Sequence, residues 1–138
     1  MSDTRHDHDA HDELAVRSLI ARIALLGDAA DANELDEFLG CFTEDTEWQA
    51  PGASGQGHAS LRAGMQSGAE GRGSDTRHVI TTQSVKFEGP DTAISDCCFL
   101  FYGDVSSAPA IRLIGVYHDT VRRTDEGWKL ARREVSFG

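Results

Sequence analysis

The stretch RHVITTQSVKFEGPDTAISDCCFLFY, residues 77–102, decides the fold class. Residues 77–87 alternate in polarity and residues 92–102 are almost continuously apolar, and both patterns are typical of β-strands. The residues Gly-Pro-Asp at 89–91 form a typical turn between them. Two similar segments follow at residues 110–122 and 128–137, separated by a turn at 125–127. The second half of the chain is therefore predicted to form a four-stranded antiparallel meander.

The first half has a helical pattern. From residue 13 to residue 30, apolar side chains recur at steps of three and four, which predicts a helix with one buried stripe. A second helix is expected to end near Phe42, and a short strand carrying Trp48 follows it at an edge of the sheet. The glycine-rich residues 52–73 are expected to form a mobile rim. Helices followed by strands indicate an α+β domain, with the helices packed on one face of a curved sheet.

Length and composition fit one domain, assigned to residues 13–138. Residues 1–12 are polar and rich in Asp and His, so we expect a disordered tail without a metal site. The net charge of −10 argues against nucleic-acid binding, and no apolar run is long enough to cross a membrane. Three cysteines, an odd number, and the lack of a signal-peptide pattern suggest the cytoplasm.

Two polar residues, Asp31 and His78, are candidates for chemistry. Helical phase places Asp31 on the inward stripe if the first helix continues that far, and it places Asp28 nearer the boundary. Asp31 could equally end the helix in solvent. His78 lies on a strand with no clearly apolar face, so it could be an exposed residue, a core histidine or a general base. An Asp facing a His would fix the imidazole tautomer and stabilise the imidazolium.

The chain resembles the nuclear transport factor 2-like superfamily in its SnoaL-like branch. Closest in pattern are scytalone dehydratases, bile-acid dehydratases and the hexachlorocyclohexane dehydrochlorinase. The resemblance rests on the order of a helix ending at Asp31, FTEDTEW at 42–48, TRH at 76–78, GVYHD at 115–119 and GWKLARR at 127–133. It implies a cone-shaped α+β barrel of curved sheet closed by helices, with a pocket inside.

The resemblance also implies a site. In those enzymes an Asp on the first helix orients a His on the first long strand, and the matching positions are Asp31 and His78. Arg133 matches a pocket arginine that could stabilise an anion, with an exposed strand residue as the alternative. The matches to pocket-lining positions, which could also be plain core, are Trp48, Phe99, Phe101 and Tyr117.

Two positions depart from the family pattern. Leu26 stands five residues before Asp31, where the dehydratases usually carry Tyr and the dehydrochlorinase carries Lys. Thr82 stands where the family carries Asn, four residues after His78. The position of Leu26 is therefore expected to contact substrate without supplying an acid.

The resulting expectation is a small cofactor-independent lyase or isomerase, dehydratase-like, acting on a mostly apolar cyclic molecule. His78 is the expected base, Asp31 its orienting partner and Arg133 an anion stabiliser. The alternative is a non-catalytic module of the same fold that binds a small ligand or another protein. The resemblance further implies a homodimer or homotrimer.

Overall fold

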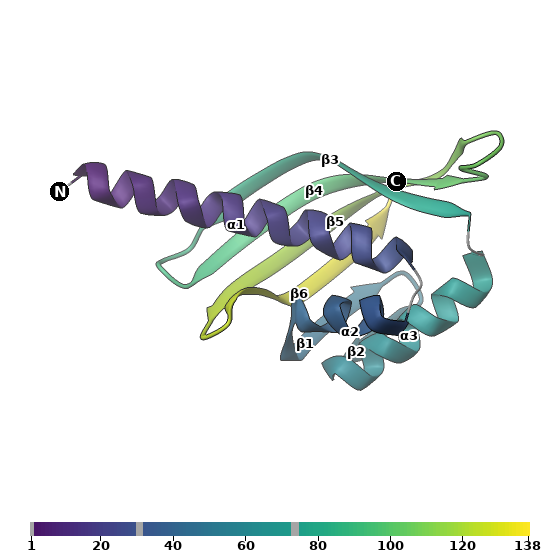
Figure 1. The fold of residues 1–138 in the computed structure, drawn as a ribbon, viewed down its shortest axis with the longest axis horizontal. Helices are drawn as coiled ribbons and strands as arrows, with labels where there is room; N and C mark the ends of the chain where they lie inside the picture. The colour runs from purple at the N-terminus through teal and green to yellow at the C-terminus, as the bar shows by residue number, and fades with distance from the viewer. Residues whose placement is uncertain (1, 30–31, 73–74) are drawn as a thin grey trace.

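The computed structural model describes residues 2–29, 32–72 and 75–138, with side chains described for 10–29, 34–67 and 75–138. Three helices and six strands follow one another along the chain (Figure 1). In chain order they are α1 (Ser2–Ala29), α2 (Ala32–Gly40), β1 (Phe42–Ala50), β2 (Ala53–Gln56), α3 (Gly57–Arg72), β3 (Thr76–Phe87), β4 (Thr92–Gly103), β5 (Ala110–Thr124) and β6 (Gly127–Phe137). Within the described residues, no helix is long and apolar enough to cross a membrane.

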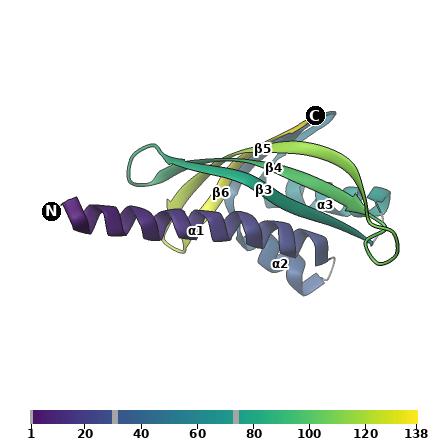
Figure 2. The same ribbon diagram turned by 90° about the horizontal axis from the view of Figure 1, so that it is seen from above.

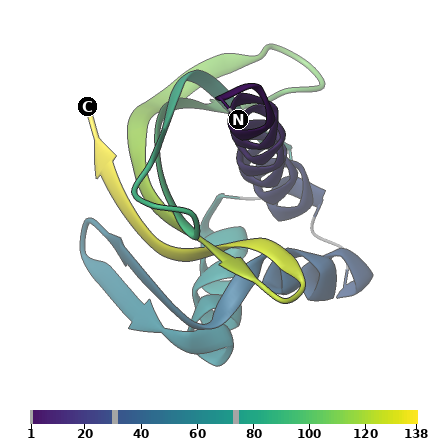
Figure 3. The ribbon, with the colours of Figure 1, turned by 90° about the vertical axis from the view of Figure 1, so that its left-hand side faces the viewer.

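The six strands form one sheet in the order β2-β1-β6-β5-β4-β3. All neighbours are antiparallel except β1 and β6, which run parallel. The sheet curves into an open arc with the helices on its concave side (Figure 3). The predicted α+β class and the four-stranded meander are confirmed. The curved sheet does not close into a barrel, because its edge strands β2 and β3 are not paired with each other.

Helix α1 fills the concave side of the sheet because its apolar stripe faces the strands. It packs against β3, alongside which it runs in Figure 2. Val16, Leu19, Ile20 and Ile23 are at most 9% exposed, and they join Phe38 and Leu39 of α2 in one core with inward residues of the sheet. Burial of this stripe, at roughly 25 cal/mol for each Å² of apolar surface, provides the main stabilisation of the helix.

The helix begins earlier than the sequence pattern indicated. Residues 2–12, expected to be a disordered tail, belong to α1. Asp12 explains the extension, since it is 8% exposed and accepts hydrogen bonds from Arg123 Nη2 at 2.7 Å and Trp128 Nε1 at 3.1 Å. These bonds connect the helix to the β5–β6 hairpin. A prediction based on apolar periodicity cannot detect such a polar contact.

The glycine-rich segment also differs from the expected mobile rim, because it forms β2 and α3. Both elements pack around Trp48 of β1, whose Nε1 donates to Ser60 Oγ at 3.2 Å. A Cβ at Gly55 would lie 2.7 Å from Trp48 Nε1, and one at Gly64 would lie 3.1 Å from the indole ring. The glycines therefore allow the close packing of the indole ring. Composition alone had suggested that this segment is mobile.

Candidate functional site

The His78 ring is fixed by one carboxylate, that of Asp28. His78 Nδ1 lies 2.6 Å from Asp28 Oδ1, and the His78 backbone N–H donates to Asp28 Oδ2 at 2.8 Å. The two side chains are 20% and 12% exposed, respectively. With Nδ1 donating to the carboxylate, Nε2 is the ring nitrogen that can accept a proton.

A β-bulge in β3 explains why the strand pattern left His78 undecided. Thr82 has a φ of 49°, and the register with β4 shifts between Thr81 and Gln83. An extra residue in one strand inverts the alternation beyond it. His78 and Ile80 before the bulge, and Gln83 with Val85 after it, therefore all lie on the half-buried side of the strand.

The partner carboxylate differs from the one expected, which was Asp31. Helix α1 ends at Ala29, and Asp31 lies outside the described residues. Asp28 was placed near the boundary, yet it is mostly buried against His78. The position of Asp28 in the last helical turn could have identified it. A carboxylate there lies at the negative end of the helix dipole, so it needs compensating hydrogen-bond donors.

His78 lines a small inner cavity of about 80 Å³ between α1 and the sheet. An apolar groove of about 440 Å³ adjoins it, and the two share the residues Phe38, Met65, Tyr117 and Arg133. Ile20, Ile23, Ala24 and Gly27 of α1 provide one wall of the inner cavity. Trp48 and Leu61 lie on the groove. Most of the lining is hydrocarbon, as in small-molecule sites.

An aromatic stack supports the histidine from the sheet. Phe99 and Tyr117 are stacked with ring centroids 4.2 Å apart, and Phe99 lies 5.9 Å from the His78 ring. Phe101 lies closer, at 4.9 Å. Gly115 permits the stack, since a Cβ there would lie 2.3 Å from the Phe99 ring. Tyr117 lines both the inner cavity and the groove, whereas Phe99 and Phe101 back the imidazole.

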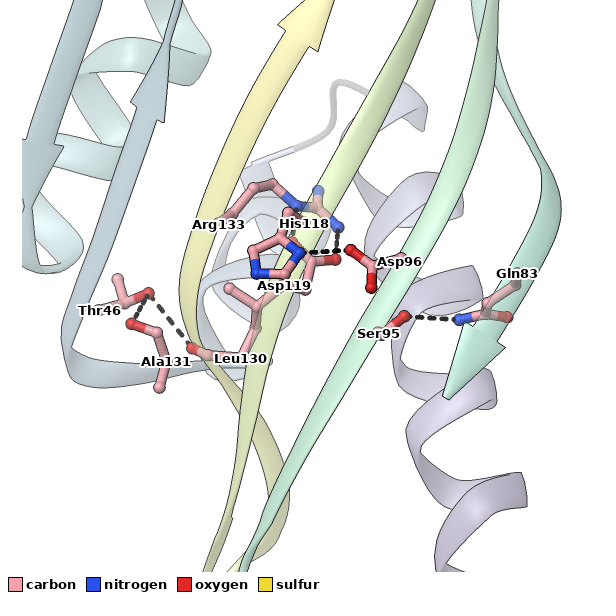
Figure 4. Close-up of polar contacts among 9 residues, drawn as sticks. All are labelled: Thr46, Gln83, Ser95, Asp96, His118, Asp119, Leu130, Ala131 and Arg133. Carbon is pink, nitrogen blue, oxygen red and sulfur yellow. Dashed lines mark hydrogen bonds and ion pairs between the residues drawn. The ribbon is translucent and has the colours of Figure 1, made fainter. Parts of the chain in front are cut away.

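Arg133 lines both spaces as well, but it is ion-paired. Its Nε and Nη2 donate to the two oxygens of Asp119 at 2.8 and 2.9 Å (Figure 4). Asp119 is fully buried, and the guanidinium lies 3.7 Å from the centroid of the Tyr117 ring. Burial acts to lower the pKa of Arg133, but the adjacent Asp119 carboxylate outweighs it and raises that pKa. The sequence reading missed Asp119, although strand alternation places it on the same face as Tyr117.

A second His–Asp pair lies on the other face of the sheet. His118 of β5 contacts Asp96 of β4 (Figure 4), with both side chains about half exposed. The hydrogen bond that His118 donates to the Asp96 carboxylate raises the pKa of His118. Because neither residue lines the inner cavity or the groove, this pair is a useful contrast for the buried one.

The two residues that depart from the family pattern, Leu26 and Thr82, line neither the inner cavity nor the groove. Leu26, expected to contact substrate, packs half-buried against the core and is not among the residues lining the inner cavity or the groove. Thr82 is exposed at the bulge. Neither departure places an acid or an amide in the cavity.

The sequence matches the profile of the SnoaL-like domain over residues 8–134. The chain belongs to this family. The match covers the helices and the sheet that form the inner cavity, so the resemblance drawn from sequence order is confirmed. A comparison of this SnoaL-like domain with curated protein sequences gave no match.

Solved structures share the fold of this SnoaL-like domain. A nuclear transport factor 2-like protein with a cystatin-like fold from Novosphingobium aromaticivorans is 26% identical, with a TM-score of 0.82 and coverage of 97% of this chain and 86% of that one. A candidate scytalone dehydratase from the same organism is 24% identical (TM-score 0.78, coverage 96% and 88%). The hexachlorocyclohexane dehydrochlorinase LinA-type3 from Novosphingobium barchaimii is 16% identical (TM-score 0.80, coverage 95% and 89%).

Proposed function

We propose that this SnoaL-like domain is a cofactor-independent lyase or isomerase, dehydratase-like, in which His78 removes a proton from carbon. The observation that carries the proposal is the hydrogen bond between His78 Nδ1 and Asp28 Oδ1 beside an apolar cavity. The carboxylate selects the tautomer in which Nε2 is basic, and it stabilises the imidazolium once the proton is taken. Asp28 replaces Asp31 in the orienting role that the sequence had suggested.

The charges around the cavity favour an uncharged ligand. Asp119 balances the charge of Arg133 within a bidentate pair, and Asp28 leaves one negative charge beside His78. The remaining lining is mostly aliphatic and aromatic. A mostly apolar cyclic molecule that enters from the groove would bury its hydrocarbon there, at roughly 25 cal/mol per Å².

The experiment that tests this function is deuterium exchange at the carbon next to the carbonyl of neutral cyclic ketones, followed by mass spectrometry. His78→Ala should lower the protein-catalysed exchange by about 10²–10⁴-fold, the range for a general base. His118→Ala is the matched control, since it removes an imidazole from an exposed His–Asp pair. Exchange by His78→Ala at the wild-type rate would exclude the proposed base.

The second candidate is a binding module of the same fold, and Leu26 and Thr82, the two departures from the family pattern, favour it. Trp48 lies on the groove, whereas Trp128 packs on Phe87 at a centroid distance of 5.8 Å, away from it. Quenching of Trp48 fluorescence by cyclic ketones, with no exchange by wild type, would support binding without catalysis. Trp128→Phe isolates the Trp48 signal.

We also propose that the protein forms a homodimer or homotrimer through the convex face of the sheet. Val79, Leu100 and Ile114 are aligned across β3, β4 and β5 on this face. Val79 and Ile114 are 39% and 50% exposed. A row of exposed aliphatic side chains without a covering helix is typical of a protein interface.

A further inference from the structure

Two rows of charged side chains cross the convex face of the sheet, beside the exposed aliphatic row, and the proposed reaction does not use them. The members of each row lie opposite one another on neighbouring strands or one strand apart. The histidine row consists of Asp96 on β4, His118 on β5 and Glu134 on β6. The arginine row, two residues further along the strands, consists of Lys86 on β3, Arg132 on β6 and Glu47 on β1.

His118 is the group that can compensate the charge of Asp96. His118 Nδ1 donates to the Asp96 carboxylate, and both side chains are half exposed (Figure 4). Among the described residues, no lysine or arginine forms an ion pair with Asp96. Glu134, on the other side of His118, accepts from Arg132 Nη2 at 2.5 Å, and Arg132 Nη1 lies 3.5 Å from Glu47. Asp96 is therefore neutralised when His118 is protonated.

The two rows are close to electrical neutrality, unlike the chain as a whole. They hold three carboxylates against two cations when His118 is neutral, and three against three when it is protonated. The chain has a formal net charge of −10, so two copies repel each other overall. A face with balanced charges is where two such chains can meet.

The histidine row lies within the area of an interface centred on the aliphatic row. Ile114, Val116 and His118 occupy alternate positions of β5, so their side chains share the convex face. Ile114 and His118 are about 13 Å apart along the strand, at about 3.3 Å per residue. A stable interface buries about 800 Å² on each partner, which corresponds to a patch about 30 Å across. Such a patch covers His118 and Asp96.

We propose that protonation of His118 controls the association of copies of this chain through the convex face. This inference rests on the homo-oligomer proposed above and is independent of the role of His78. Association removes Asp96 from water, and a desolvated carboxylate without a cation is strongly unfavourable. With His118 protonated, the group that loses water is a hydrogen-bonded ion pair. Assembly therefore takes up protons, at most one for each His118 that it covers.

The groups around His118 determine the direction of the pH effect. The hydrogen bond to Asp96 is the largest influence and raises the pKa of His118, and the charges of Glu134 and Asp119 act in the same direction. Asp119 lies on the opposite face of β5, paired with Arg133. Covering Asp96 raises the pKa of His118 further in the oligomer than in the free chain. Association is therefore strongest below the pKa of the free chain, and it weakens as the pH rises through the pKa of the oligomer.

The test is sedimentation velocity of the wild-type protein over a range of concentrations at about pH 6 and about pH 8.5, on either side of the range in which histidine titrates. A difference of one pKa unit between the free and the assembled state corresponds to a tenfold change in the equilibrium constant. The dissociation constant should therefore rise by about tenfold for each His118 in the interface.

Two substitutions should remove the pH dependence in opposite ways. His118→Gln retains a donor for Asp96 but has no charge, so association should be weak at both pH values. Asp96→Asn removes the carboxylate that requires the proton, so association should be strong at both. His58→Gln and Asp36→Asn are the matched controls, since His58 on α3 contacts the Phe42 carbonyl oxygen and Asp36 lies on α2. Both controls should keep the wild-type pH dependence.

The other outcomes separate this proposal from the oligomer on which it rests. Equal dissociation constants at the two pH values, or an unchanged pH dependence in His118→Gln, would overturn the role of His118 and leave the interface in place. A wild-type protein that is monomeric at both pH values would overturn the interface and the role of His118 together. Deuterium exchange by His78 would be unaffected by either result.

Discussion

Asp28 breaks a local rule of helix design, since its carboxylate stands in the last turn of α1, where the helix dipole is negative. Two donors of a single residue compensate for this position, the backbone N–H and the ring Nδ1–H of His78. Residues that break local rules tend to lie at functional sites. The bidentate contact also couples ring orientation to the backbone of β3, so that the imidazole cannot rotate without losing a bond.

The first prediction concerns this carboxylate. Asp28→Asn keeps an oxygen that can accept the His78 backbone N–H, but its amide also adds a donor opposite Nδ1. The favoured tautomer then changes, and exchange activity should fall by about 10²–10⁴-fold with little loss of stability. Deuterium exchange and urea denaturation measure the two effects.

Asp31→Asn provides the control for this prediction. It should retain activity, since the structure assigns the contact with His78 to Asp28. The reverse result, an inactive Asp31→Asn and an active Asp28→Asn, would restore the assignment made from sequence.

At the residue scale, the sequence analysis named His78 and Arg133 as candidates but identified the structural partner of neither. Asp28 was missed because helical phase ranked Asp31 as the more inward of the two carboxylates. Asp119 was missed because the pairing of a buried Asp with Arg133 depends on the register between β5 and β6, in which the two residues are opposite. Register across strands is not visible in one sequence.

At the scale of elements, the bulge in β3 has the largest effect on the site. The bulge allows Val85 and Phe87, in the second half of the strand, to face the core on the same side as His78. Thr82 adopts a φ of 49°, a conformation that is uncommon for residues other than glycine. Such strain is retained in the fold because the packing of residues on both sides requires the extra residue.

The second prediction is that deleting Thr82 disrupts the site. Strict alternation would return, so either His78 and Ile80 or Val85 and Phe87 would turn to solvent. Exposing at least one large apolar side chain should cost about 2 kcal/mol or more in the free energy of unfolding, measured in urea. Thr82→Gly retains the extra residue and should remain close to wild type. A deletion variant of unchanged stability would show that the bulge does not set the inward face.

Element types and order were predictable because apolar residues recur at helical steps over residues 13–30 and because turn residues separate the later strand segments. The structure of residues 2–12 and 53–72 was not predictable, because specific polar contacts hold these segments: Asp12 with Trp128, and Trp48 with Ser60. Both contacts join segments whose composition is typical of flexible chain. Polar anchors of this kind leave no periodic signal in the sequence.

For the whole molecule, the open sheet presents two different faces. The concave face holds the core and the cavity, and the convex face carries the aligned row of Val79, Leu100 and Ile114. The class of fold could be predicted from sequence, but the exposure of this row could not, since it depends on which face the helices cover.

The third prediction is that Ile114→Glu dissociates the oligomer, as measured by sedimentation velocity. A charge in an apolar interface is desolvated without a partner, so association should weaken by at least 100-fold, about 3 kcal/mol. Leu25→Glu is the control, since Leu25 is 71% exposed on α1 rather than on the sheet. A wild-type protein that sediments as a monomer would exclude the convex face as an interface.

The parallel pairing of β1 with β6 has a consequence for biosynthesis. The Thr46 hydroxyl lies 3.2 Å from the carbonyl oxygen of Leu130, a residue 84 positions later (Figure 4). Strand β1, and with it Trp48, has no sheet partner for its inner edge until β6 has been made. On the ribosome, which releases the chain from its N-terminal end, the groove therefore cannot assemble until β6 has emerged. Until then, the hydrophobic residues of α1 and α2 have no complete sheet to pack against.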